Sequence, residues 1–298
     1  MDKYILNISI SPLDLRDYIY ESNSDIPLTY DLRDFLLPIR DQGKQGSCYA
    51  QASSTMKEYQ EFVDYNSNEY MSPQFIYNQR DNLYDDNPDN DSGMYGRNVM
   101  KILKNIGVCY EKSYPYGTLE SRENISNEIY QEAALHKIKN YAAIYSLSNL
   151  KSSIVENGPC LITFPVYNYG MEMWKPEYDN QTFKGGHAMT VVGFTEDSFI
   201  IRNSWGTNFG DQGYCYYKFE DWGMHWELWT TVDEKTIFLD PKEKESDEEL
   251  EEESEQESEE EPDPESEEEP EQESEEEPEP EIKKKTVMEE ICSRLLRR

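Results

Sequence analysis

The stretch QGKQGSCYA, residues 42–50, joins a loop with two glycines to the start of a predicted helix. In the following residues the apolar positions recur at spacings of four, three and four and so share one helical face: Ala52, Met56, Tyr59 and Val63. Cys48 therefore lies in the first turn of a helix that packs inside a domain. A lone cysteine is usually a buried, inert thiol, but N–H groups at a helix start stabilise negative charge and favour a thiolate here.

Two later segments carry polar side chains at the edges of strand-like runs. His187 opens an apolar run in KGGHAMTVVGF, residues 184–194, and Asn203 stands in RNSWG, residues 202–206. A single histidine at a strand end is usually a hydrogen-bonded structural residue, and His136 and His225 keep that interpretation. The plain interpretation of the Asn203 segment is a glycine-rich hairpin with a packing tryptophan.

Taken in order, these three segments resemble the papain-like cysteine peptidases. Cys48 precedes His187 by 139 residues and Asn203 by 155, close to the separation of about 130–150 residues typical of papain and the cathepsins. The resemblance extends over about residues 26–220 and includes MSPQF at 71–75, YPY at 114–116 and ENGP at 156–159.

The resemblance implies roles for individual residues. Cys48 would be the nucleophile, His187 its base, and Asn203 the residue that orients the imidazole. Gln42 and the N–H of Cys48 would stabilise the oxyanion. The peptide-binding residues implied are Ser92, Gly93, Met94, Tyr95, Gly186, Ala188 and Trp205. An apolar specificity pocket of Met94, Tyr95 and Ala188 is implied as well, and no metal or organic cofactor.

The implied function is a cysteine-type endopeptidase that acts on peptides or proteins through a thioester. The same fold and the same residues would also suit an exopeptidase or an acyl transferase, and the residues alone leave these alternatives open. A further alternative is a scaffold whose acidic end binds basic proteins.

Departures from the family pattern indicate the compartment. Gln45 and the segment Asp91-Ser92-Gly93-Met94 stand where the family has two cysteines, so the disulfide that the resemblance would imply there is absent. Five scattered cysteines and no export signal predict free thiols in an intracellular, reducing compartment. The leader, residues 1–25, is shorter than the propeptides of lysosomal members. It suits a minimal bacterial or large-DNA-virus branch, with the host cytoplasm or the virion as the location of a viral protein.

The pattern predicts an α+β protein with the two-lobe papain-like fold and a cleft between the lobes. The peptidase domain is predicted at 26–240, with a helical lobe at about 40–130 and a β-rich lobe at about 131–240. Helices are expected at 72–84 and 95–106, with Gly107 as a C-cap. Strands are expected at 159–166, 187–194, 198–203 and 213–219.

Residues 241–298 differ in composition from the rest of the chain. They hold 27 acidic and 8 basic residues, with the unit ESEEEP three times at a period of eight. Such density of Glu and Pro predicts a disordered segment at 241–282. Residues 283–298 have a basic flank and apolar residues at helical spacing, which predicts a short amphipathic helix.

The overall charge excludes some partners. The chain carries a net charge of −34, and its first 240 residues alone carry −15, which opposes binding to a phosphate backbone. No apolar stretch reaches the length of about 18–20 residues that a membrane span needs. We expect a monomer that binds peptide or protein substrates rather than nucleic acid or a membrane.

Overall fold

The computed structural model describes residues 4–80, 91–117 and 119–232, and the findings below concern these residues. The chain divides into two compact units, Met1–Leu239 and Asp240–Arg298. The second unit lies outside the described residues. The predicted acidic segment at 241–282 and the predicted helix at 283–298 therefore lie outside them too.

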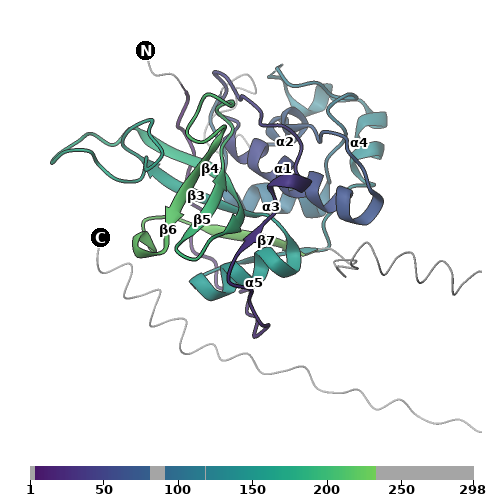
Figure 1. Ribbon diagram of the computed structural model, residues 1–298. Helices are drawn as coiled ribbons and strands as arrows, with labels where there is room; N and C mark the ends of the chain where they lie inside the picture. Colours follow the sequence, from purple (N-terminus) through teal and green to yellow (C-terminus); the bar gives the residue numbers. More distant parts are fainter. Residues whose placement is uncertain (1–3, 81–90, 118, 233–298) are drawn as a thin grey trace, which may run out of the picture. The chain divides into compact units, whose positions relative to one another are not determined.

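Most helices gather on one side of the first unit and most strands on the other, whereas the helix at Leu147–Asn157 packs against the sheet (Figure 1). The helices are α1 (Cys48–Tyr65), α2 (Pro73–Asn78), α3 (Gly96–Asn105), α4 (Asn127–Ala133) and α5 (Leu147–Asn157), with short 3-10 helices at Arg33–Phe35, Arg122–Asn124 and Phe219–Asp221. Helix α2 begins at Pro73 because the Ser72 hydroxyl accepts a hydrogen bond from the N–H of Phe75 at 3.0 Å.

Within the described residues, seven strands form one antiparallel sheet. They are β1 (Tyr30–Asp31), β2 (Asn140–Ala143), β3 (Cys160–Val166), β4 (Gly185–Phe194), β5 (Ser198–Arg202), β6 (Tyr214–Lys218) and β7 (Leu228–Val232). Their order is β2-β7-β3-β4-β5-β6, with β1 paired to β4. Strand β4 pairs with β3 along Gly185–Val191, whereas β5 reaches along β4 only as far as Thr190. The beginning of β4 is therefore uncovered by β5.

Helix α1 is buried on every side, not only on its predicted apolar face. Residues 48–61 are all buried, because α1 packs against β4 on one side and against α2 on the other. Its polar side chains are paired accordingly. Lys57 and Glu61 form an ion pair at 2.9 Å, and Glu58 pairs with Arg40 at 2.8 Å. Pairing of this kind is required wherever charges leave water.

The predicted elements agree with the structure except at one helix end. Strands β3 to β6 and helix α3 match their predicted ranges within two residues, and Gly107 follows α3 with a φ of +92°. The helix predicted at 72–84 ends at Asn78 instead. The guanidinium of Arg80 donates to the carbonyl of Tyr77 at 2.9 Å and so caps the end of the helix. Residues 81–84 lie outside the described residues.

Two separate hydrophobic cores define the lobes. The helical core is built around α1, α2 and α3 and includes Phe75 and Leu103. The core of the sheet lies between α5 and the strands and includes Leu150, Phe164 and Phe199. The expected α+β, two-lobe architecture is confirmed. Among the described residues, no helix combines the length and the apolar character that crossing a membrane requires.

Candidate active site

Cys48 lies where the two lobes meet. It is the first residue of α1, and its Sγ accepts a hydrogen bond from the N–H of Ala188 on β4 at 3.4 Å. The side chain has no exposed surface. Because Ala188 follows His187, this contact brings the thiol of the helical lobe against the histidine strand of the other lobe.

His187 and Asn203 form the second part of the site. His187 stands in β4, and Asn203 directly follows Arg202, the last residue of β5, which pairs with Thr190 of β4. His187 Nε2 lies 2.8 Å from Asn203 Oδ1, and the N–H of Ser204 donates to the same oxygen at 2.7 Å. Oδ1 therefore acts as acceptor, which assigns the proton of the neutral imidazole to Nε2.

This tautomer leaves His187 Nδ1 as a proton acceptor. Nδ1 is buried and makes no hydrogen bond among the described residues. An imidazole with Nε2–H fixed by an amide and Nδ1 open is arranged as a general base.

Trp205 covers the histidine–asparagine pair. Its ring stacks on that of His187, with centroids 4.4 Å apart and an interplanar angle of 24°. Trp205 is itself 2% exposed. The indole therefore excludes water from the hydrogen bond between His187 and Asn203, and such exclusion strengthens the bond.

Gln42 is fixed at both ends of its amide. Its Nε2 donates to the carbonyl of Gln45 at 3.0 Å, and its Oε1 accepts from the hydroxyl of Ser204 at 2.6 Å. This leaves one N–H of the amide to be directed at a ligand. The N–H of Cys48 lies in the first turn of α1, where amides have no acceptor within the helix. The two groups are the candidate oxyanion donors.

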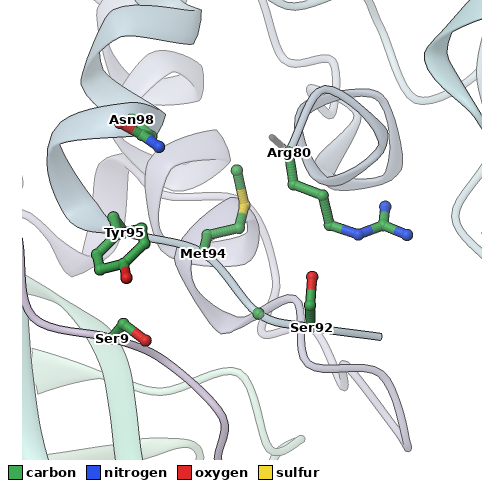
Figure 2. Close-up of a pocket in the computed structure, with 7 residues that line it drawn as sticks. Ser9, Arg80, Ser92, Met94, Tyr95 and Asn98 are labelled. Atoms are coloured by element: carbon green, nitrogen blue, oxygen red, sulfur yellow. The ribbon is translucent and has the colours of Figure 1, made fainter. Parts of the chain in front are cut away.

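The predicted peptide-binding residues lie on two walls. Ser92, Gly93, Met94 and Tyr95 precede α3, and Figure 2 shows them around a pocket that Arg80 and Asn98 also line. The other wall is the start of β4, with Gly186 and Ala188. Met94 and Ala188 belong to one hydrophobic cluster together with Cys48.

The space between these walls holds part of the chain itself. Residues Tyr4–Ser9, which we call the strap, pair in parallel with both walls. Asn7 bridges to Gly186 of β4, and Ser9 bridges to Tyr95, with the N–H of Ser9 donating to the carbonyl of Met94 at 3.2 Å. Ser9 also lines the pocket of Figure 2. The sequence predicts only a leader at residues 1–25, without a position.

Burial favours the neutral forms of both reacting groups. Burial raises the pKa of the Cys48 thiol to about 12, against the opposing effect of the N–H of Ala188. Burial also lowers the pKa of His187 to about 4, against the hydrogen bond to Asn203. The expectation of a thiolate at this helix start does not hold for the occupied cleft, because loss of water outweighs the effect of the helix start.

Asp91 takes part in a bridge that the sequence did not reveal. Its carboxylate accepts from the N–H of Gly46 at 2.9 and 3.0 Å, and the hydroxyl of Tyr77 donates to it as well. Asp91 thus ties the loop before Cys48 to the wall that begins at Ser92. The two segments that a disulfide would join in the family pattern are joined here by hydrogen bonds to a charged group.

No metal site accompanies this arrangement in the part of the chain that the structure describes. There, no three His, Cys, Asp or Glu side chains gather closely enough to hold an ion. The four described cysteines are free thiols.

The fold and the arrangement of these residues define a papain-like cysteine protease. The chain belongs to the papain family of cysteine proteases, which matches residues 26–225. In the solved structures it resembles xylellain, a cysteine protease from Xylella fastidiosa. That match has a TM-score of 0.65 and 28% identity, and it covers 78% of this chain and 96% of xylellain.

Curated relatives are about as similar to this chain in sequence as xylellain is. An uncharacterized peptidase C1-like protein of Acanthamoeba polyphaga mimivirus is 29% identical over 194 residues, covering 58% of this chain and 62% of the relative. A cathepsin L-like proteinase of Fasciola hepatica is 29% identical over 211 residues, covering 65% and 61%. The chain thus spans about three fifths of the length of these relatives.

Proposed function

We propose that this protein is a cysteine endopeptidase in which Cys48, His187 and Asn203 hydrolyse peptide bonds. The observation that carries the proposal is the contact set around β4. The N–H of Ala188 meets Cys48 Sγ at 3.4 Å, and the preceding His187 is held by Asn203 at 2.8 Å. In this arrangement the thiol can act as the nucleophile and the imidazole as its base. The amide of Asn203 orients the imidazole.

These positions support the following reaction. His187 Nδ1 takes the proton of Cys48, and the thiolate attacks the peptide carbonyl carbon to form a tetrahedral oxyanion. Gln42 Nε2 and the N–H of Cys48 stabilise that oxygen. His187 then gives the proton to the leaving amine, which leaves a thioester on Cys48. Water, deprotonated by His187, attacks the thioester and releases the acid with the regenerated thiol.

Internal cleavage is favoured over end trimming by the path of the strap. Residues 4–9 pair with both walls of the cleft, and Ser11 continues beyond it, with its N–H donating to Glu227 at 3.3 Å. On the side of Ser11, an extended chain therefore continues past the cleft. A substrate bound by the same pairing would present an internal bond to Cys48.

Product analysis tests this proposal. A folded protein with mapped cleavage products should give new internal termini, and His187→Ala should abolish them. Release of single residues or dipeptides from one terminus would contradict endoproteolysis and favour the exopeptidase alternative. An amide formed with an added amine would favour the acyl transferase instead.

The acidic segment 241–282 supports a second proposal, which rests on the sequence alone. The excess of acidic residues there suits recruitment of basic protein substrates. Replacing the glutamates of the three ESEEEP units by glutamine should slow cleavage of a basic protein and leave cleavage of a neutral peptide unchanged. The difference should shrink at high salt. Equal rates on both substrates would leave the segment without this role.

The free cysteines support a location in a reducing compartment, which we also propose. Millimolar reductant should raise the activity and leave the melting temperature unchanged. A marked fall of the melting temperature would contradict this proposal.

A further inference from the structure

A small cavity lies between α1 and the sheet, next to the candidate catalytic pair. Gln51 and Thr55 line it from α1. Thr190 lines it from β4, and Asn203 lines it from the segment after β5. The volume of the cavity is about 10 Å³, close to the roughly 10–15 Å³ that one water molecule needs. A cavity of this size suits a water molecule and no larger ligand.

Asn203 uses only one end of its side-chain amide. Its Oδ1 accepts hydrogen bonds from His187 Nε2 and from the N–H of Ser204. Its Nδ2 carries two N–H groups, is buried, and has no hydrogen-bond partner among the described residues. A buried donor without an acceptor is costly, so such groups usually bond to protein or to an ordered water. The side chain that orients His187 is therefore held at one end only.

Gln51 offers the complementary group from α1. Its Oε1 is buried and has no hydrogen-bond partner in the part of the chain that the structure describes, and the side chain is 3% exposed. The other end of its amide lies at Tyr116. Burial raises the pKa of that tyrosine to about 12, and hydrogen bonds from Ser47 and Gln51 oppose the effect. An amide that donates through Nε2 keeps its oxygen free to accept.

Two hydroxyl groups of the cavity can complete the bonding of a water molecule. Thr55 Oγ1 donates to the carbonyl of Gln51 at 3.3 Å, and Thr190 Oγ1 donates to the carbonyl of Ala52 at 3.2 Å. Each hydroxyl has given its proton away and keeps lone pairs that can accept. A water that donates to one of them, besides bonding to Asn203 and Gln51, has three partners, which is typical of buried water.

We propose that this cavity binds one ordered water molecule, which accepts a hydrogen bond from Asn203 Nδ2 and donates one to Gln51 Oε1. Gln51 is then a positioning residue, because it acts on His187 only through the water and the amide of Asn203. A bridging water holds two groups nearly as well as a direct hydrogen bond. The proposal rests on the proposed peptidase function, since the bridge holds the amide that orients the base of that same site.

Nuclear magnetic resonance of the full, ¹⁵N-labelled chain tests for the water without requiring peptidase activity. The side-chain NH₂ group of Asn203, assigned by through-bond spectra, should show a nuclear Overhauser signal to water with the sign of a bound molecule. Gln51→Met removes the acceptor and keeps an unbranched side chain of similar length, so the signal should be lost. A signal relayed from the threonine hydroxyls would remain. The wild-type spectrum tests for the water even if this variant does not fold.

Steady-state kinetics test the positioning role. In Gln51→Met the amide of Asn203 is held less firmly, so kcat for a fluorogenic peptide should fall about tenfold. KM should stay unchanged, because Gln51 does not touch the substrate in this proposal. A loss of general packing would instead lower the melting temperature without this split between kcat and KM.

Gln60→Met is the matched control. Gln60 lies on the same helix, is 4% exposed, and donates to Thr231 Oγ1 at 2.9 Å, but it does not line the cavity. The same substitution there should keep both the water signal of Asn203 and the wild-type kcat. Circular dichroism checks that both methionine variants are folded.

The outcomes distinguish this proposal from the proposed function. A water signal that is lost in Gln51→Met, together with the fall in kcat, supports both. The same loss of signal in a wild type that hydrolyses no peptide supports the water site and contradicts the peptidase. A wild type without the signal, or a signal that persists in Gln51→Met, overturns the bridge whether or not peptide is hydrolysed. An unchanged kcat in Gln51→Met overturns the positioning role.

Discussion

The ring of Tyr4 lies nearly parallel to that of Trp205, with the two ring centroids 4.5 Å apart. Trp205 also stacks on the ring of His187. Residues about 200 positions apart in the chain thus form one stack over the candidate catalytic pair. Aromatic pairs of this kind are worth about 0.5–1.5 kcal/mol beyond the area they bury. The stack therefore makes a small but specific contribution to closing the cleft.

Gln42 should matter for turnover rather than for binding. Its amide is positioned by Gln45 and Ser204, and it would donate to an oxygen that becomes charged only in the transition state. Gln42→Ala should lower kcat about 10²–10³-fold with little change in KM. Steady-state kinetics on a fluorogenic peptide measure both constants. A rise in KM at unchanged kcat would assign Gln42 to ground-state binding instead.

Asp91 should contribute to stability through its bridge to the loop before Cys48. Its carboxylate accepts from Gly46, and hydrogen bonds to charged groups are worth about 1.5–3 kcal/mol. Asp91→Ala should therefore lower the free energy of unfolding by about 2 kcal/mol in urea titrations. Asp41 is the matched control, because it accepts from Gly43 in the same loop but is exposed. Equal losses in Asp91→Ala and Asp41→Ala would contradict the special role of Asp91.

The closed cleft should be most stable near neutral pH. In the closed state burial raises the pKa of Cys48 to about 12 and lowers the pKa of His187 to about 4. As pH falls below about 6.5, the ordinary pKa of histidine, His187 binds a proton in the open state. In the closed state His187 stays neutral until the pH reaches about 4. As pH rises above the ordinary range of the thiol, the open state loses a proton that the closed state keeps.

Protonation of His187 at low pH and deprotonation of Cys48 at high pH both favour the open state. Each raises the equilibrium constant for opening by up to about tenfold for each pH unit. Asp91 is a charged group acting on Cys48 from the neighbouring wall, and it also raises the pKa of the thiol. Hydrogen exchange of the Ser9 amide, corrected for its intrinsic rate, measures opening. Its protection should be greatest between about pH 6.5 and 8.5. Protection that changes in one direction only, from pH 5 to pH 10, would contradict this.

The sequence predicts those parts of the site that are marked by local patterns. Cys48 follows a glycine-rich loop, and His187 and Asn203 stand at strand ends with glycines beside them, so each could be found from a short segment. The strap could not be found in this way. Tyr4 and Ile8 carry no local pattern, and their partners lie on β4 and beyond, which only the tertiary structure brings together.

Asp91 illustrates a second limit. In the sequence, Asp91 belongs to the segment in which the family has a cysteine. Its presence there predicts only that the family's disulfide is absent. The structure shows the hydrogen bonds from Gly46 and Tyr77 that take its place. A carboxylate can accept hydrogen bonds from the backbone N–H groups of a glycine-rich loop. The spacing in the sequence does not show which N–H group donates to Asp91.

Hydrolysis of an internally quenched peptide by the wild type and by Cys48→Ala is the decisive measurement for Cys48 as the nucleophile. We expect measurable turnover in the wild type and none above background in Cys48→Ala, with both proteins folded as judged by circular dichroism. Comparable turnover in the two proteins would contradict the assignment of Cys48 as the nucleophile.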